Sequence, residues 1–487
     1  MNFARDVVDA APPGGRALVE LTGDGTRREW SFAEVAERSS RLAGTLKRHG
    51  VHQGDVVLTL IGNRPEWVFA MVACFRIGAV VLPCNEQLRA KDLRLRLGVA
   101  EPRLILADER NLGELTATRP DCPVLTIPDD SLHAAEPAAP VELEPTDPCL
   151  ITFTSGTTGE PKGVVHGQRY LPGQRLQAEH WLDARPGDLV WCTAASGWSK
   201  SARNAFIAPW IRGATALLHD GRFDPFQRLE ILAAERVNVL CMAPTEYRVI
   251  AKRATLSPLP ELRTLVAAGE ALNPEVIRAF DEVLGIEIRD GYGQTETGQL
   301  TANPVGEPVR PGSMGLPLPG VDLRVVDGEL VLADPTSDPT FFVRELGGDP
   351  APEGRAWHTG DRVGQDADGY LYFEGRADDV IISAGYRIGP FEVESALVSH
   401  TAVAEAAVVA APDEERGAVV RAVVVLRDGF QPSPELAAQL QEHVREQTAP
   451  YKYPRIVDFA PELPKTASGK VQRALLRAGS PTGDSRT

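Results

Sequence analysis

Short apolar runs alternate along the chain with stretches whose apolar residues recur at helical spacing, and this alternation limits the possible folds. The runs VVLTLIG, AVVLPC, RLILAD and CLITFT are typical of buried strands, whereas SFAEVAERSSRLAGTLKRHG and PEWVFAMVACFRIG have helical periodicity. The pattern returns after residue 181, from GDLVWCTA to NVLCMAP. Alternating strands and helices predict an α/β fold with largely parallel sheets.

The character of the sequence changes twice toward the C-terminus. Between about residues 315 and 374, the segments VDLRVVDGELVLAD, FFVRELGGD and ADGYLYFEG predict a small β-rich subdomain. After residue 375 the pattern is that of a compact α+β domain. We therefore expect a large N-terminal domain, residues 1–375, made of two α/β layered subdomains and the β-rich subdomain, followed by a small α+β domain, residues 376–487.

Charge and cysteine content exclude several classes of function. The chain has 51 Lys and Arg against 67 Asp and Glu, a formal charge of −16, which disfavours nucleic acid as the main ligand. Six cysteines without a C-x-x-C pair fit neither a disulfide framework nor a zinc site. No secretory signal is visible, and Arg76 interrupts the most apolar stretch, so no membrane insertion is expected. These features indicate a cytoplasmic protein with reduced thiols.

A loop rich in glycine and hydroxyl residues follows the apolar run CLITF directly. Three glycines among hydroxyl residues let backbone N–H groups and hydroxyls converge on an anion, so the loop predicts a phosphate cradle. It lacks the adjacent Gly-Lys pair of a Walker A loop. The alternative is a flexible surface turn. The candidate residues are Thr154, Ser155, Gly156, Thr157, Thr158, Gly159 and Lys162.

Five further motifs follow in order along the chain. They are DGYGQTE at 290–296, TGD at 359–361, GRADD at 375–379, SAGYR at 383–387 and PKTASGK at 464–470. Together with the loop, they resemble the ANL superfamily, which contains acyl-CoA synthetases, peptide-synthetase adenylation domains and luciferases. The resemblance covers nearly the whole chain, and it implies two half-reactions: ATP activates a carboxylate to an acyl-adenylate, and a thiol then displaces AMP.

The resemblance assigns roles to individual residues. Glu296 would bind Mg²⁺ and Thr295 the α-phosphate, while Lys470 would bridge the substrate carboxylate and the α-phosphate. Asp361 would hold the ribose with support from Arg376. Without the resemblance, Glu296 reads as a solvated loop charge, Asp361 as an Asx turn and Lys470 as a surface lysine. The remaining residues of the implied nucleotide pocket are Gly269, Glu270, Asp290, Gly291, Tyr292, Gly293 and Gln294.

The same resemblance implies that the C-terminal domain rotates between an adenylation pose and a thioesterification pose. Asp378 occupies the hinge position, although Asp378 and Asp379 also read as charges at the start of a helix. Gly385 would approach the thiol tunnel, where a Cβ would obstruct. The candidate CoA-binding residues are Ala384, Gly385, Tyr386, Arg387, Arg416, Arg445, Tyr453 and Arg455.

Between the motifs, the chain is most similar to the medium-chain acyl-CoA synthetases, on GWSKSARN at 197–204, APTEYR at 243–248 and PYKYPR at 450–455. Trp198 would line the acyl pocket, with an ordinary core aromatic as the alternative. Acetyl-CoA synthetases have Trp where this chain has Gly293, so an open pocket is implied and acetate is disfavoured.

The implied enzyme is an AMP-forming acid:CoA ligase of fatty acid metabolism that uses ATP, CoA and Mg²⁺. Its acid would be medium-chain, branched or aromatic. Two alternatives stay open at this point: a stand-alone adenylation enzyme that loads a carrier protein, and a nucleotide-binding protein that has lost catalysis.

Overall fold

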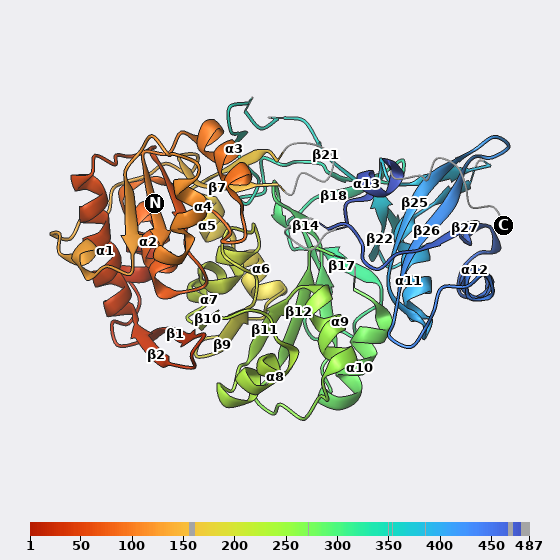
Figure 1. Cartoon of the computed structure of the whole chain (residues 1–487). Helices are drawn as coiled ribbons and strands as arrows, with labels where there is room; N and C mark the ends of the chain where they lie inside the picture. Colours follow the sequence, from red (N-terminus) through yellow and green to blue (C-terminus); the bar gives the residue numbers. More distant parts are fainter. Residues whose placement is uncertain are drawn as a thin grey trace.

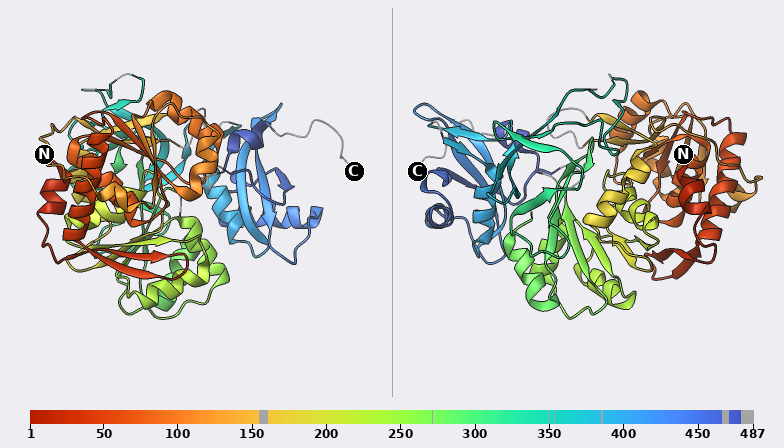
Figure 2. Two further views of the ribbon diagram at one scale, coloured as in Figure 1. Left: turned by 60° about the vertical axis from the view of Figure 1, so that its left-hand side comes forward. Right: turned by 180° about the vertical axis from the view of Figure 1, so that it is seen from behind.

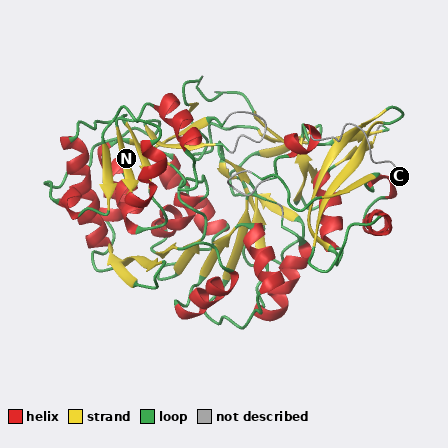
Figure 3. Ribbon diagram, viewed as in Figure 1, coloured by secondary structure: helices red, strands yellow, loops and turns green. Residues whose placement is uncertain are grey.

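The computed structural model describes residues 1–154, 161–270, 272–348, 350–352, 354–384, 386–465 and 471–478. In these residues the chain forms a large α/β domain with two seven-stranded sheets, a six-stranded antiparallel sheet, and a smaller α+β unit at the C-terminal end (Figures 1 and 2). Helices and strands alternate through the large domain (Figure 3). The predicted fold class is therefore confirmed.

The first sheet has the strand order β20-β8-β7-β4-β3-β5-β6, in which β7, β4, β3, β5 and β6 are parallel. The four apolar runs predicted as strands here are β3, β4, β5 and β7. Its strands are β3 (Val56–Leu60), β4 (Val80–Pro83), β5 (Leu104–Asp108), β6 (Val124–Ile127), β7 (Pro148–Phe153), β8 (Gly163–Gly167) and β20 (Arg344–Glu345), with helices α1 (Phe32–Arg48), α2 (Pro65–Ile77), α3 (Ala90–Ala100) and α4 (Leu112–Thr116).

The second sheet has the order β13-β12-β11-β9-β10-β1-β2. Its strand β1 comes from the N-terminal end of the chain and pairs in parallel with β10, from Leu18 opposite Ala216 to Thr22 opposite Asp220. The elements are β1 (Arg16–Thr22), β2 (Arg27–Ser31), β9 (Leu189–Cys192), β10 (Thr215–Asp220), β11 (Val239–Met242), β12 (Thr264–Ala268), β13 (Ile288–Gly291), α5 (Tyr170–Gly173), α6 (Arg175–His180), η4 (Arg203–Ile207), α7 (Ala208–Ile211), α8 (Pro225–Ala234), α9 (Pro244–Arg253) and α10 (Pro274–Leu284).

The main hydrophobic core lies between these two sheets, around α2. All but one residue of α2 are buried, from Pro65 to Ile77, which explains why its sequence is apolar on every side. Helix α1 covers it and begins at a capping box, in which the Ser31 hydroxyl accepts from the Glu34 N–H at 3.2 Å and the Glu34 carboxylate accepts from the Ser31 N–H at 2.8 Å. The core thus joins both sheets into one body.

The predicted β-rich subdomain is present as a six-stranded antiparallel sheet, with one correction. The segment FFVRELGGD was expected in this sheet, but its strand β20 pairs with β8 of the first sheet, Arg344 opposite Val165. The apolar pattern was read correctly as a strand, and only its pairing partner was wrong. The strands are β16 (Thr301–Ala302), β17 (Ser313–Pro317), β18 (Leu323–Val326), β19 (Glu329–Leu332), β21 (Trp357–Gln365) and β22 (Leu371–Arg376), next to the hairpin β14 (Gly293–Gln294) and β15 (Gly298–Gln299).

The C-terminal unit packs α11 and α12 against a three-stranded sheet of β25, β26 and β27. No helix begins at Asp378 or Asp379, since the strand β23 follows, so the interpretation of these residues as helix-entry charges is wrong. The elements are β23 (Ile381–Ser383), β24 (Tyr386–Ile388), α11 (Pro390–Ser399), β25 (Val403–Asp413), β26 (Gly417–Leu426), α12 (Pro434–Gln447), β27 (Ile456–Phe459) and α13 (Arg473–Ala478). Among the described residues, no helix combines the length and the apolar character needed to cross a membrane.

The buried ring of His166 predicts a loss of stability in acid. His166 lies on β8 against Tyr170, and burial lowers its pKa to about 3. As the pH falls from 6.5 toward 3, the unfolded chain binds a proton here that the folded chain does not. The free energy of unfolding should therefore fall by up to about 1.4 kcal/mol per pH unit from this group.

Urea unfolding of the wild type and of His166→Gln between pH 7 and pH 4 measures this contribution. The free energy of unfolding of His166→Gln should fall less steeply with decreasing pH than that of the wild type. The exposed control His52→Gln should show the same pH dependence as the wild type. If the free energy of unfolding of the wild type and of His166→Gln depended on pH in the same way, the contribution assigned to His166 would be refuted.

Candidate active site

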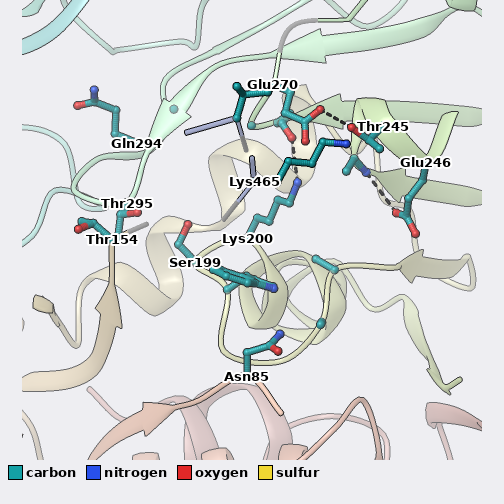
Figure 4. A pocket seen from close by; sticks show the side chains of 18 of the residues that line it. Asn85, Thr154, Ser199, Lys200, Thr245, Glu246, Glu270, Gln294, Thr295 and Lys465 are labelled. Carbon is teal, nitrogen blue, oxygen red and sulfur yellow. Dashed lines mark hydrogen bonds between the residues drawn. The ribbon is translucent and has the colours of Figure 1, made fainter. Parts of the chain in front are cut away.

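A cavity of about 2350 Å³ lies where the large domain meets the C-terminal unit. Residues at the carboxyl ends of β9, β11, β12 and β13 line it, because parallel strands end at the same edge of a sheet. Residues of β21, β22, α11 and α13 close the other side. Figure 4 shows side chains from distant parts of the chain converging on the pocket, among them Asn85, Lys200, Glu270, Gln294 and Lys465.

Asp361 is the centre of a hydrogen-bond network in this cavity. Its Oδ2 accepts from the Tyr292 hydroxyl and, at 2.8 Å, from Gln294 Nε2, while Oδ1 accepts from Arg376 Nη1 at 3.2 Å. Burial and the adjacent Asp361 carboxylate raise the pKa of Tyr292, so its phenol stays a donor. In the described part of the chain, the Asp361 carboxylate accepts no backbone N–H of its own turn, so the Asx-turn interpretation is wrong. The network brings together four predicted nucleotide-binding residues.

Asp290 and Glu270 lie on the opposite wall, beside Gly269. Asp290 accepts from the Gly291 N–H at 2.9 Å, and burial raises its pKa well above the usual value. Glu270 is held differently: burial raises its pKa, but the Arg248 guanidinium and the Thr245 hydroxyl, at 2.8 and 2.7 Å, outweigh burial and leave it ionised. The wall therefore offers one carboxylate prone to protonation and one fixed anion.

Thr295 and Glu296 line the cavity at the turn between β14 and β15. Burial raises the pKa of Glu296, and no lysine or arginine of the described ranges lies within 4.0 Å of its carboxylate. The described residues contain no group of three or more metal-binding side chains. One carboxylate without a described ion-pair partner, in a cavity that also contains the base of the glycine-rich loop, is a donor set that suits Mg²⁺, because Mg²⁺ keeps several waters and takes its other ligands from the substrate. Glu296 is thus not a solvated loop charge.

The predicted phosphate loop is described only at its two ends. Thr154 and Lys162 pair across its base, with the Thr154 N–H donating to the Lys162 carbonyl at 2.9 Å and the Lys162 N–H donating to the Thr154 hydroxyl at 3.1 Å. The Lys162 ammonium contacts Glu345 of β20 at 3.2 Å. Both residues line the cavity. The positions Ser155, Gly156, Thr157, Thr158 and Gly159 lie outside the described residues, as does Lys470.

Trp198 and Gly293 both line the cavity, as an acyl pocket would require. Trp198 is half-buried, which speaks against an ordinary core aromatic. A Cβ on Gly293, however, would meet the Gly298 carbonyl oxygen of the paired strand β15 at 1.8 Å. The backbone itself therefore requires glycine here, and an open acyl pocket is not needed to explain it.

This contact predicts the effect of Gly293→Ala. The methyl group forces β14 and β15 apart, so we expect the free energy of unfolding to fall by about 1–3 kcal/mol. Activity should fall for short and long acids alike. Urea unfolding and kcat/KM for propionate and octanoate check both expectations. A variant of wild-type stability that discriminates only by acid length would restore the pocket-size explanation.

The described CoA candidates form two groups outside the cavity lining. Arg445 and Arg455 lie over the ring of Tyr453, with 3.9 and 5.0 Å from each guanidinium carbon to the ring centre. The Ala384 N–H donates to the Arg416 carbonyl at 3.0 Å, and Tyr386 is exposed and stacks on Tyr451. Of Arg387 only the backbone is described, and Gly385 is not. The hinge candidate Asp378 is exposed and lies 3.8 Å from Arg376 Nε, at the edge of the cavity.

Sequence reasoning missed several polar residues of the cavity. Lys200, Arg203 and Lys465 all line it, and Arg248 holds Glu270. Lys200 and Arg203 lie inside the segment GWSKSARN that had been singled out, and two basic residues three positions apart after Trp198 were the available signal.

Residues 5–335 match the family model of AMP-binding enzymes, and residues 392–470 match the model of the AMP-binding enzyme C-terminal domain. The chain belongs to the AMP-binding enzyme family. The acyl-coenzyme A synthetase ACSM4, mitochondrial, of Rattus norvegicus is 38% identical, with 98% of this chain and 90% of the relative covered. The uncharacterized acyl-CoA ligase YtcI of Bacillus subtilis (strain 168) is 40% identical, over 95% of this chain and 92% of the relative.

Among solved structures, this AMP-binding enzyme is similar to the anthranilate CoA ligase AuaEII in complex with anthranoyl-AMP. The TM-score is 0.88 at 28% identity, with 98% of this chain and 97% of the other covered. The likeness therefore extends over both domains. The predicted family is confirmed.

Proposed function

We propose that this AMP-binding enzyme is an AMP-forming acyl-CoA synthetase. In the first half-reaction, a carboxylate oxygen of the acid attacks the α-phosphorus of ATP, the bond to the β-phosphate oxygen breaks, and acyl-AMP and pyrophosphate form. In the second, the CoA thiol loses its proton and attacks the acyl carbon, and AMP leaves. The relatives named acyl-CoA synthetase and acyl-CoA ligase support this reaction.

The observation that carries the proposal is the shared cavity. It contains the Asp361 network, the unpaired carboxylate of Glu296 and the base of the glycine-rich loop. A ribose diol needs acceptors such as the Asp361 carboxylate, and phosphates need the donors of a loop and a cation. Glu296 would hold Mg²⁺, which neutralises phosphate charge when it is bound. Arg376 would then shift a hydrogen bond from Asp361 to the nucleotide.

The placement of the C-terminal unit supports a two-pose mechanism. The Lys252 ammonium on α9 donates to the Ala404 carbonyl on β25 at 3.0 Å and joins the two domains. The described CoA candidates do not line the cavity in this arrangement, whereas Arg376, Asp378 and Lys465 do. We infer that the arrangement is the adenylation pose, and that a turn about Asp378 brings the Ala384–Arg416 and Tyr453 groups to the cavity for the second half-reaction.

Pyrophosphate release with ATP and Mg²⁺ tests the proposal, with acids from acetate through octanoate, branched acids and benzoate, each with and without CoA. Release that depends on the acid and is sustained by CoA is the expected result. Release that stalls with CoA but continues with a holo carrier protein would favour carrier loading. If no acid led to pyrophosphate release in any condition, a nucleotide-binding protein without catalysis would be favoured.

A further inference from the structure

Two basic side chains line one wall of the cavity directly after Trp198. Lys200 and Arg203 are three residues apart, and the segment between them enters the helical run of η4. Lys200 lies in the turn before this run, and both side chains reach the cavity. The cavity that contains the predicted acyl pocket therefore carries two cations where a hydrocarbon chain would need an apolar surface.

Arg203 is buried without a counter-ion. Only 5% of its surface is exposed, and in the described ranges no carboxylate lies within 4.0 Å of the guanidinium. Its Nε has no hydrogen-bond partner. The polar neighbour of the guanidinium is the phenol of Tyr170, which is neutral because burial raises its pKa. Since burying a charge without a partner is unfavourable, Arg203 calls for an anion that no described residue supplies at ion-pair distance.

The groups around Arg203 are polar, and the carboxylate that shares Tyr170 with it as a neighbour, Asp338, bonds the Thr340 hydroxyl at 2.7 Å. His166 is neutral, because burial lowers its pKa to about 3. The side chains of Asn204 and Gln177 bond each other at 2.8 Å, and each keeps a buried polar atom without a partner, Nδ2 and Oε1. On the cavity side, Arg203 Nη1 lies 3.4 Å from the position of a Cβ on Gly298, beside the turn that carries Glu296. Among the described residues, the guanidinium thus reaches the cavity without an ion pair within 4.0 Å.

Lys200 is the second cation that lines the cavity, in addition to Arg203. Its ammonium donates to the Ala268 carbonyl at 3.1 Å and lies against Gly269 (Figure 4). Within the described parts of the chain it has no ion pair, because the Glu270 carboxylate is engaged by Thr245 and Arg248. One hydrogen bond leaves two N–H donors of the ammonium for a ligand.

We propose that Lys200 and Arg203 bind a second anionic group on the acid, so that the substrate is a dicarboxylic acid of which one end is adenylated. This inference rests on the proposed acyl-CoA synthetase function. The reacting carboxylate meets the α-phosphate near Thr295 and Glu296, and the distal carboxylate accepts charge-assisted hydrogen bonds from the guanidinium, which matches carboxylate geometry with two parallel N–H groups. The wall thereby selects against plain alkanoates.

Length-matched acids test the inference with the wild-type enzyme. Pyrophosphate release is measured for butyrate to octanoate against succinate, glutarate, adipate, pimelate and suberate, with ATP, Mg²⁺ and CoA. At least one dicarboxylate should exceed the monocarboxylate of equal length by about 10-fold or more in kcat/KM, because an alkanoate leaves the buried guanidinium unpaired. A preference for the monocarboxylate at every length overturns the proposal.

Arg203→Met and Lys200→Met then localise the effect. In Arg203→Met, the ratio of kcat/KM for the best dicarboxylate to that for its monocarboxylate should fall at least about 30-fold, mainly through KM. Arg203→Lys should recover part of it. The matched control is Arg212→Met, on the same segment but outside the cavity lining, where Arg212 pairs with Glu179 at 2.7 Å; its ratio should equal that of the wild type.

A binding measurement separates this inference from catalysis. Saturating dicarboxylate should raise the melting temperature of the wild type and not that of Arg203→Met. If Arg203→Met instead raises KM for ATP equally with every acid, the cations serve the nucleotide and the proposal is wrong. If no acid of either class releases pyrophosphate while the dicarboxylate still shifts the melting temperature, the acyl-CoA synthetase function fails and the anion site stands.

Discussion

Replacing Asp361 by alanine should lower kcat/KM for ATP by about 100- to 1000-fold. The carboxylate is 4% exposed and fixes Tyr292, Gln294 and Arg376 at once. Its loss would remove the proposed ribose acceptor and release the donors that we propose to position the nucleotide. Removal of one preorganised polar group from a water-excluded site lowers the rate by about this factor. Pyrophosphate release at varied ATP concentration, with the acid saturating, measures the effect.

Two further variants test whether the carboxylate charge of Asp361 causes the decrease in kcat/KM for ATP. Asp361→Asn keeps the shape of the side chain but not its charge, and should fall between the wild type and Asp361→Ala. Asp322→Asn removes an exposed carboxylate that pairs with its neighbour Arg324 at 2.7 Å and with no other basic residue of the described ranges, so it should behave as the wild type. An Asp361→Ala enzyme with unchanged KM and kcat for ATP would contradict the assigned role.

Lys470→Ala should separate the two half-reactions. We expect pyrophosphate release to fall about 1000-fold, because a cation between the carboxylate and the α-phosphate stabilises charge that develops in the transition state. Thioester formation from a supplied acyl-adenylate and CoA should persist within about threefold. Both rates can be followed by chromatography of the acyl-CoA product and by a pyrophosphate assay.

The exposed lysine Lys91 on α3 provides the control, since Lys91→Ala removes the same charge outside the cavity lining. Equal loss of both half-reactions in Lys470→Ala would mean that this lysine supports the fold or both poses. Because acetylation also removes the charge of a lysine, an acetylated Lys470 should reproduce the alanine variant.

The predictable part of the fold is the part set by local pattern. The runs VVLTLIG and CLITFT are buried strands, and PEWVFAMVACFRIG is a buried helix, because apolar periodicity reports burial directly. Partner choice between strands is not local: β20 reads as a strand in either sheet, and only the packing against β8 decides. For the same reason the pairing of β1 could not be predicted from the sequence, because its partner β10 lies about 200 residues farther along.

The candidate site divides in the same way. Asp361, Tyr292, Gln294 and Arg376 come from three separate motifs, and their convergence was predicted from the order of the motifs rather than from geometry. From the sequence, the glycine at position 293 was explained by the size of the substrate. The structure explains it by the close approach of the Gly298 backbone. Lys200 and Arg203 were overlooked because an unpaired buried charge becomes visible only when its surroundings are known.

The pairing of β1 with β10 has a consequence for synthesis on the ribosome. The strand that leaves the exit tunnel among the first 22 residues has no parallel neighbour until residues 215–220 are made. During that interval the edge of β1 that faces away from β2 stays open, which invites pairing with other chains. A truncated product that stops before β10 should therefore aggregate, and a nascent chain should need protection by a chaperone until β10 has been translated.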